Sequence, residues 1–409
     1  MRSAIFAAVA IARLAAAAPT PQQFDFAAVL DAPSPSATGP PLTVVANATS
    51  VFSVDTASIA ASVSAEVTTV ATASITGASA SAASTQEPSS TGLAKRGPPP
   101  PPPPPPKTTT SSSTASSSKT TTSQQSTTST TSSTSACPTT PEAAFEAYPE
   151  FHSDALKAIT PAGYVETFKD LNGSTSANSY ITFKTLTSYS VSDCAKLCDN
   201  TTLCTAFNIY IERDPSLNPT LNDTAANTTG QYCPNPSSIT NYKCSLWGSS
   251  IDATSATNYG DYREQFQVVI VASNGYDKTN NTTPAPCPGY EAPSNCTGAI
   301  SSGGSYCLGS HFFPGPYDPS VCGIYAQAQT DTNKAAAKAK GQSTYVPSNM
   351  FNAYMVKKNS VAQGTYCSLF NTVLSSSWAS FEGGWAGQNY FGIESSWTYA
   401  LSQQDDGKL

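Results

Sequence analysis

Residues 190–210 read S-V-S-D-C-A-K-L-C-D-N-T-T-L-C-T-A-F-N-I-Y, and residues 244–247 add C-S-L-W. A second stretch repeats this pattern: residues 318–326 read D-P-S-V-C-G-I-Y-A, residues 348–354 read S-N-M-F-N-A-Y, and residues 367–370 read C-S-L-F. Each copy predicts a capped helix carrying a cysteine, a strand with Phe-Asn-x-Tyr, and a strand that opens Cys-Ser-Leu-aromatic. An internal repeat indicates one supersecondary unit used twice. We therefore expect two small disulfide-bonded modules in tandem, a plan used more often for binding than for catalysis.

The helix starts carry local signals. Ser190 followed by Asp193 resembles a capping box, and Asp318 followed by Pro319 gives an N-cap with proline at the first helical position. Helical spacing places Val191 and two cysteines on one face. We expect that face to lie on a sheet, and in the second module we expect a matching set. The expected sheet-facing residues are Phe207, Ile209, Ile211, Cys244 and Leu246 in the first module, and Phe351, Ala353, Met355, Cys367 and Leu369 in the second.

The repeat also predicts disulfide pairing. All eleven cysteines lie between Cys137 and Cys367, and the chain looks exported, so disulfides are expected. When the two copies are superposed on Phe-Asn-x-Tyr, two cysteines of the first copy recur in the second. The other two are replaced together, by Ala326 and Ser348. Cysteines that are lost as a pair are most simply explained as bonded to each other. The expected bridges are Cys194–Cys244, Cys198–Cys204 and Cys322–Cys367.

Five cysteines have no partner assigned by this argument: Cys137, Cys233, Cys287, Cys296 and Cys307. Because the total is odd, one of them is a free thiol or pairs between chains. A buried thiol is the more ordinary outcome, since free cysteine is commonly buried.

The helix with C-x3-C, followed by C-x2-F-x-x-Y and C-x-L-aromatic, resembles the PAN/apple module. The resemblance covers about residues 190–276, extending to Cys137 at most, and the second copy departs from it by lacking one bridge. It implies an α+β fold in which each module is an antiparallel sheet with one packed helix, and a role in recognising protein or carbohydrate. The layout as a whole is similar to secreted proteins of filamentous fungi.

The N-terminal third has three compositional zones. Residues 1–17 resemble a secretory signal peptide, with Arg2 before an apolar run. Residues 18–96 predict a disordered pro-segment that ends at Lys95-Arg96, a dibasic pair typical of kexin-type processing. Residues 97–136 hold nine consecutive prolines and a Ser/Thr run, which predicts a disordered stalk. Module 1 is then expected at 137–276, a linker at 277–286 and module 2 at 287–409.

The net charge and the Asn-x-Ser/Thr sequons limit the classes of partner and the compartment that we expect for this chain. Because the net charge is −7, we expect no nucleic-acid partner. No stretch after the signal peptide reaches the length of a membrane span. Asn-x-Ser/Thr sequons indicate surface loops of an extracellular or cell-wall-associated glycoprotein. The expected glycosylation sites are Asn172, Asn200, Asn222, Asn227, Asn281 and Asn295.

Catalytic patterns are weak in this sequence. Its two histidines have no companion at zinc-ligand spacing, and no nucleophile-elbow, Walker or HExxH motif occurs. We therefore expect no enzyme activity, no cofactor and no metal. The pair Glu382 and Glu394 leaves glycoside hydrolysis as a third-ranked possibility.

Aromatic residues crowd the last third of the second module. Trp and Tyr faces stack on sugars and anchor protein interfaces. Trp385 lies among glycines and is the best exposed candidate, with Trp378 and Tyr390 beside it in the ligand-binding set. Others, such as Phe391 and Trp397, are expected in the core facing the helix. The favoured function is recognition of wall polysaccharide or an extracellular glycoprotein; the alternative is a structural or adhesive wall component without a discrete ligand site.

Overall fold

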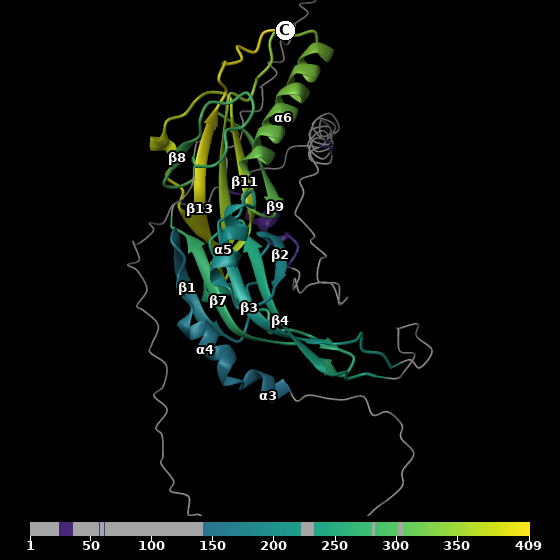
Figure 1. The fold of residues 1–409 in the computed structure, drawn as a ribbon. Helices are drawn as coiled ribbons and strands as arrows, with labels where there is room; N and C mark the ends of the chain where they lie inside the picture. Colours follow the sequence, from purple (N-terminus) through teal and green to yellow (C-terminus); the bar gives the residue numbers. More distant parts are fainter. Residues whose placement is uncertain are drawn as a thin grey trace, which may run out of the picture. The chain divides into compact units, whose positions relative to one another are not determined.

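The computed structural model describes residues 24–35, 57, 61, 142–221, 233–279, 283–301 and 306–409. The predicted signal peptide, the stalk and most of the pro-segment lie outside these residues. So do Lys95, Arg96, Cys137, Asn222, Asn227 and Asn281. Figure 1 shows the two larger sheets of the described part and the helices that lie beside them.

The N-terminal half, residues 142–279, is built on a five-stranded antiparallel sheet with strand order β1-β7-β3-β4-β2. Three α-helices accompany it rather than the single one expected, because residues 142–157 also fold as helix. Its elements are α3 (Glu142–Glu146), α4 (Pro149–Lys157), β1 (Tyr164–Leu171), β2 (Tyr180–Leu186), α5 (Val191–Asp199), β3 (Ala206–Pro215), β4 (Ser238–Trp247), η1 (Ala253–Ser255), β5 (Tyr262–Arg263), β6 (Phe266–Gln267) and β7 (Val269–Lys278).

The C-terminal half, residues 283–409, has the strand order β12-β13-β10-β11-β9, with β8 also paired to β13. The order β7-β3-β4-β2 of the first sheet and β13-β10-β11-β9 of the second are the same arrangement of corresponding strands. The elements are β8 (Ser294–Cys296), β9 (Cys307–Pro314), α6 (Pro319–Ala339), β10 (Met350–Lys358), β11 (Val361–Phe370), η2 (Ser376–Trp378), β12 (Gly383–Ala386) and β13 (Asn389–Ala400). The described chain is thus an α+β arrangement of antiparallel sheets.

Both repeat helices begin where the capping residues stand. The Ser190 hydroxyl accepts a hydrogen bond from the Asp193 N–H, and the Asp318 carboxylate accepts one from the Ser320 N–H. These bonds satisfy backbone donors that a helix start leaves open. Disulfides then join helix to sheet in each half and close one short loop. The bridges are Cys194–Cys244, Cys198–Cys204 and Cys322–Cys367, the same pairs that the repeat predicts.

The sheet-facing residues lie largely as their spacing indicates. Phe207, Ile209, Cys244 and Leu246 pack with α5, and the five expected residues of the second half pack in the cluster that contains Cys322 of α6. Ile211 differs, because it packs with Phe145 of α3 and with β7 instead. The extra helices account for this difference, since they cover the far end of β3.

A bulge recurs at the same place in both sheets. The pairing register shifts after Ile209 where β3 meets β7, and after Ala353 where β10 meets β13. The bulged strands carry left-handed residues there, with φ of 54° at Ala272 and 53° at Ser395. An extra residue in one strand reverses the faces of the side chains that follow it. This explains why Phe391 and Trp397 lie in different clusters, although both were expected to face the helix.

A buried asparagine stabilises each bulge. The Nδ2 of Asn208 donates to the Ser273 hydroxyl and to the next backbone carbonyl, each at 2.9 Å. The Nδ2 of Asn352 donates to the Ser396 hydroxyl and to the next carbonyl, each at 3.0 Å. Both side chains are fully buried. The asparagine of the repeated Phe-Asn-x-Tyr motif therefore supplies the polar partners that the interrupted ladder needs.

The two halves share one core. A single cluster of buried side chains holds Trp247 and Ile251 of the first half with Phe351 and Leu369 of the second. The backbones also meet at Gly248, whose N–H donates to Ser179 and whose carbonyl accepts from the Tyr317 N–H. A Cβ at Gly248 would lie 2.3 Å from Pro316, so glycine permits this approach. Contacts thus join both halves in one compact unit.

One part of the predicted pro-segment is ordered. Residues 24–35 contain the helix α1 (Phe26–Leu30), which packs on the C-terminal half. The expectation of disorder is wrong for these residues. Among the described residues no helix is long and apolar enough to cross a membrane.

Candidate functional site

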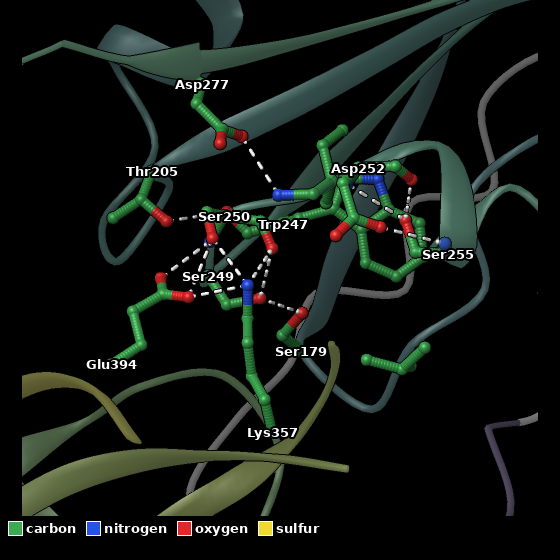
Figure 2. Close-up of polar contacts among 12 residues, drawn as sticks. Ser179, Thr205, Trp247, Ser249, Ser250, Asp252, Ser255, Asp277, Lys357 and Glu394 are labelled. Atoms are coloured by element: carbon green, nitrogen blue, oxygen red, sulfur yellow. Dashed lines mark hydrogen bonds and ion pairs between the residues drawn. The ribbon is translucent and has the colours of Figure 1, made fainter. Parts of the chain in front are cut away.

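A polar cluster lies at the junction of the two halves (Figure 2). The Lys357 ammonium pairs with Glu394 at 2.6 Å and donates to the Ser250 hydroxyl at 2.5 Å. Ser250 in turn donates its N–H and its hydroxyl to the two oxygens of Glu394, at 2.9 and 2.7 Å. Lys357 and Glu394 of the second sheet therefore both form hydrogen bonds with Ser250, which follows β4 of the first sheet.

The pKa values of two carboxyl groups at this junction, Glu394 and Asp277, are shifted in opposite directions. Burial alone would raise the pKa of Glu394, but Lys357 and the hydrogen bonds from Ser250 outweigh it, and the pKa is lowered. Burial raises the pKa of Asp277 to about 7, against the opposing effect of the Ile251 N–H that it accepts at 2.9 Å. Glu394 is therefore ionised at neutral pH, while Asp277 changes its charge there.

The cluster holds a serine beside a lysine, a combination that can serve nucleophilic catalysis when the amine is neutral. Here the Lys357 ammonium forms an ion pair with the ionised Glu394, and an ammonium group has no lone pair to take the Ser250 proton. Glu394 is also one of the two carboxylates considered for glycoside hydrolysis, and both its oxygens are engaged with Ser250 and Lys357. The arrangement suits a structural connection between the halves.

The exposed aromatic residues give the stronger candidate for binding. Trp385 on β12 and Tyr390 on β13 face each other across a hairpin, with ring centroids 5.3 Å apart. The side chains are 69% and 38% exposed. Gly387, with φ of +61°, lies in the turn between them, where its left-handed conformation suits glycine. Two of the three predicted ligand-binding residues are thus brought together on a short, tightly turned hairpin.

Amide side chains border this pair. The Tyr390 N–H donates to the Asn359 Oδ1 at 2.9 Å, and the Asn359 Nδ2 donates to the Asn389 Oδ1 at 2.9 Å. The backbone of Asn359 also donates to the Tyr390 carbonyl at 2.8 Å. Neither asparagine is marked by the sequence pattern: Asn359 meets the β12–β13 hairpin only in the folded chain, and Asn389 carries no signal beyond its place before Tyr390. We call Trp385, Tyr390, Asn359 and Asn389 the hairpin site.

The third predicted residue, Trp378, belongs to a different group. It lies in η2, is 40% exposed, and contacts Tyr306 edge-on with ring centroids 6.1 Å apart. Trp378 contacts Tyr306 and accepts backbone hydrogen bonds from Ser301 and Ser380, none of which belongs to the hairpin site. The described sequons Asn172, Asn200 and Asn295 are all exposed, as attachment of a glycan requires.

Comparison of the chain with family models, with characterised proteins and with solved structures gives no match. Function must therefore be argued from the side chains and their geometry.

Proposed function

We propose that this chain is a secreted, non-enzymatic recognition protein, extracellular or associated with the cell wall, that binds neutral carbohydrate through the hairpin site. The carbohydrate is a wall polysaccharide or the glycan of an extracellular glycoprotein. The observation that carries the proposal is the exposed pair of Trp385 and Tyr390 on one hairpin. Two aromatic rings exposed side by side form a contiguous apolar surface, which is the kind of surface that marks binding sites.

The chemistry of the hairpin site matches that of a sugar ring. The faces of Trp and Tyr offer apolar surface for the C–H groups of a pyranose. The neighbouring amides of Asn359 and Asn389 offer both donors and acceptors for hydroxyl groups. The net charge of −7 favours a neutral ligand over an anionic one.

The sequence supports the same proposal from another direction. The cysteine pattern resembles the PAN/apple module, whose role is recognition of protein or carbohydrate. Disulfides link helix to sheet in both halves, which suits a protein that works in an oxidising compartment. We extend this to a tandem of two such modules displayed on a glycosylated stalk.

Substitution of the hairpin aromatics tests the proposal. We expect Trp385→Ala to weaken binding to a neutral wall polysaccharide at least tenfold in a pull-down or by calorimetry, and Tyr390→Ala to weaken it about three- to tenfold, because each removes a stacking surface. Tyr262→Ala is the matched control, since Tyr262 is 70% exposed but lies on β5 of the other half.

The result has two clear contrary outcomes. Binding that survives Trp385→Ala and Tyr390→Ala together, with the folded state intact by circular dichroism, would place the ligand elsewhere. No binding of the unaltered protein to any neutral polysaccharide or glycan array would instead favour a structural or adhesive wall component.

A further inference from the structure

Segment 24–35 behaves like a ligand of the second sheet. Its helix α1 is capped by Asp25, whose carboxylate accepts hydrogen bonds from the N–H groups of Ala27 and Ala28. The Asp25 N–H donates to the Tyr366 hydroxyl at 3.0 Å, and the Pro33 carbonyl accepts from the Asn178 side chain at 3.0 Å. A five-residue helix does not persist in water by itself. Contacts with the folded halves therefore hold it in place.

The surface under this segment is apolar and aromatic. We call it the aromatic face, made of Phe312, Tyr354, Val356, Tyr366 and Phe391. All five side chains are buried, Val356 completely, and Tyr354 stacks on Tyr366 with ring centroids 5.2 Å apart.

Three side chains of the segment seat it on the aromatic face. Phe24 stacks on Tyr366 with centroids 4.8 Å apart, and Phe26 meets Phe391 edge-on at 5.3 Å. Val29, on the next turn, is only 1% exposed. The spacing Phe-x-Phe-x-x-Val thus places apolar groups against the sheet, while Leu30 remains 43% exposed. This one-sided pattern is how an amphipathic helix occupies a groove.

The first half has different residues at the positions that form the aromatic face in the second half. The register of the corresponding strands matches Tyr354 with Tyr210, Val356 with Glu212 and Tyr366 with Lys243. There the Lys243 ammonium pairs with Glu212 at 2.6 Å, so charge partners fill the position. The aromatic face is therefore a property of the second half alone, the half on which the segment lies.

We propose that the aromatic face is a binding surface for a short apolar helical peptide, and that this chain's own segment 24–35 occupies it only while a covalent chain joins the two. Residues 36–141 make that connection, and the sequence predicts processing within it at Lys95-Arg96. A tether gives its ligand an effective concentration, on the order of a millimolar for a short flexible linker and lower for a longer one. The few contacts described above are enough to hold a tethered segment in place, but they bind a free peptide only weakly. The segment therefore dissociates once the connection is cut.

The cut is hydrolysis of the Arg96–Gly97 peptide bond by a dibasic-specific endoprotease. Water supplies a hydroxyl to the Arg96 carbonyl carbon and a proton to the Gly97 nitrogen. The aromatic face then becomes available to another peptide with the same spacing. The proposal is independent of the hairpin site, since Phe391 and Tyr390 are successive residues of β13 and point to opposite faces of that strand.

The test compares two forms of the secreted full-length protein. One carries Lys95→Gln and Arg96→Gln and stays uncut; the other is cut after Arg96, verified by mass, and freed of released peptide by gel filtration. A fluorescein-labelled peptide of residues 24–35 is titrated against each and followed by polarisation. We expect micromolar binding to the cut form and at least tenfold weaker binding to the uncut form, in which the tethered segment competes.

Variants are placed in the peptide, so they cannot unfold the protein. Val29→Asp should reduce peptide binding at least tenfold, whereas Leu30→Asp, at the neighbouring exposed position, should change it less than twofold. Equal binding to both forms, no binding to the cut form, or a segment that stays with the cut protein through gel filtration would each overturn the proposal. Trp385→Ala should leave peptide binding unchanged, which separates this result from the test of the hairpin site.

Discussion

At the scale of single residues, Asn208 and Asn352 show why a motif recurs in both copies. Each is fully buried and donates to a serine hydroxyl and a carbonyl beside a bulge. A buried donor without a partner costs about 1–3 kcal/mol, so neither the bulge nor its asparagine can change alone. The sequence shows that the motif is repeated, but it does not show the structural role of the asparagine. The serines that accept these bonds lie on strands whose bulge no local pattern announces.

Asp277 gives the sharpest prediction at this scale. Its folded pKa is raised to about 7 from 3.8, so the native state favours the protonated form. This group's contribution to stability is full below pH 4 and is lost as the pH rises through 7. Asp277→Asn removes that loss while an amide oxygen can still accept the Ile251 N–H. We expect the variant to be more stable than the parent by about 2–4 kcal/mol at pH 8, and equal to it near pH 4.

Urea unfolding of both proteins at a series of pH values measures this difference. The conservative change Asp252→Asn serves as a control, because Asp252 is a nearby carboxylate that caps the short η1 turn. A difference between Asp277→Asn and the parent that stays constant from pH 4 to 8 would contradict the assignment.

At the scale of elements, the disulfides should differ in what they contribute. The Cys322–Cys367 bridge spans 45 residues and joins α6 to β11, whereas Cys198–Cys204 spans only 6. Because a crosslink reduces the entropy of the unfolded chain more when its loop is longer, we expect replacement by alanine pairs to cost roughly 4 kcal/mol for the long loop and roughly 2 kcal/mol for the short one.

Thermal or urea unfolding of the two double variants measures this order. The Cys194–Cys244 variant, with a span of 50 residues, should behave like the long-loop variant. A short-loop variant that is the least stable of the three would mean that native packing, rather than loop length, decides the contribution.

The sequence predicted elements well where the repeat constrains them. The capped helices, the paired strands and the pairing of six cysteines follow from comparing two copies. Three features did not follow. The bulge turned Phe391 to the opposite face from Trp397, the helices α3 and α4 lie outside the repeated stretch, and α1 is stabilised by contacts with residues hundreds of positions away.

At the scale of the whole molecule, the shared core predicts that both halves unfold together. The polar cluster at the junction adds specific coupling between Lys357 and Glu394. We expect Lys357→Met to destabilise the protein by about 1–3 kcal/mol, because it leaves a largely buried carboxylate without its cation. The double variant Lys357→Met with Glu394→Gln should regain most of that loss.

A double-mutant cycle by urea unfolding measures this coupling. An interaction energy of about 0.5–3 kcal/mol is expected for groups in direct contact. Strict additivity of the two changes would show that Lys357 and Glu394 do not interact energetically. Separate unfolding transitions for the two halves in the parent protein would show that the halves do not unfold together.

The candidate site was only partly visible in the sequence. Trp385 among glycines indicated an exposed aromatic residue, and that position is 69% exposed. Its neighbour Asn389 directly precedes Tyr390 in β13, but Asn359 comes from the turn after β10 and reaches Tyr390 only in the folded chain. A pattern in one segment cannot reveal a site made by several.

The contrast between the two sheets has a practical consequence for preparing the protein in pieces. In the first half the position of Tyr366 belongs to Lys243, which forms buried ion pairs with Glu212 and Asp214. The second half has no such ion pair at this position, and residues 24–35 cover the aromatic face there. A recombinant fragment that begins after residue 35 would bare this patch, and self-association should grow with its concentration. Adding residues 24–35 back as a separate peptide should restore its solubility.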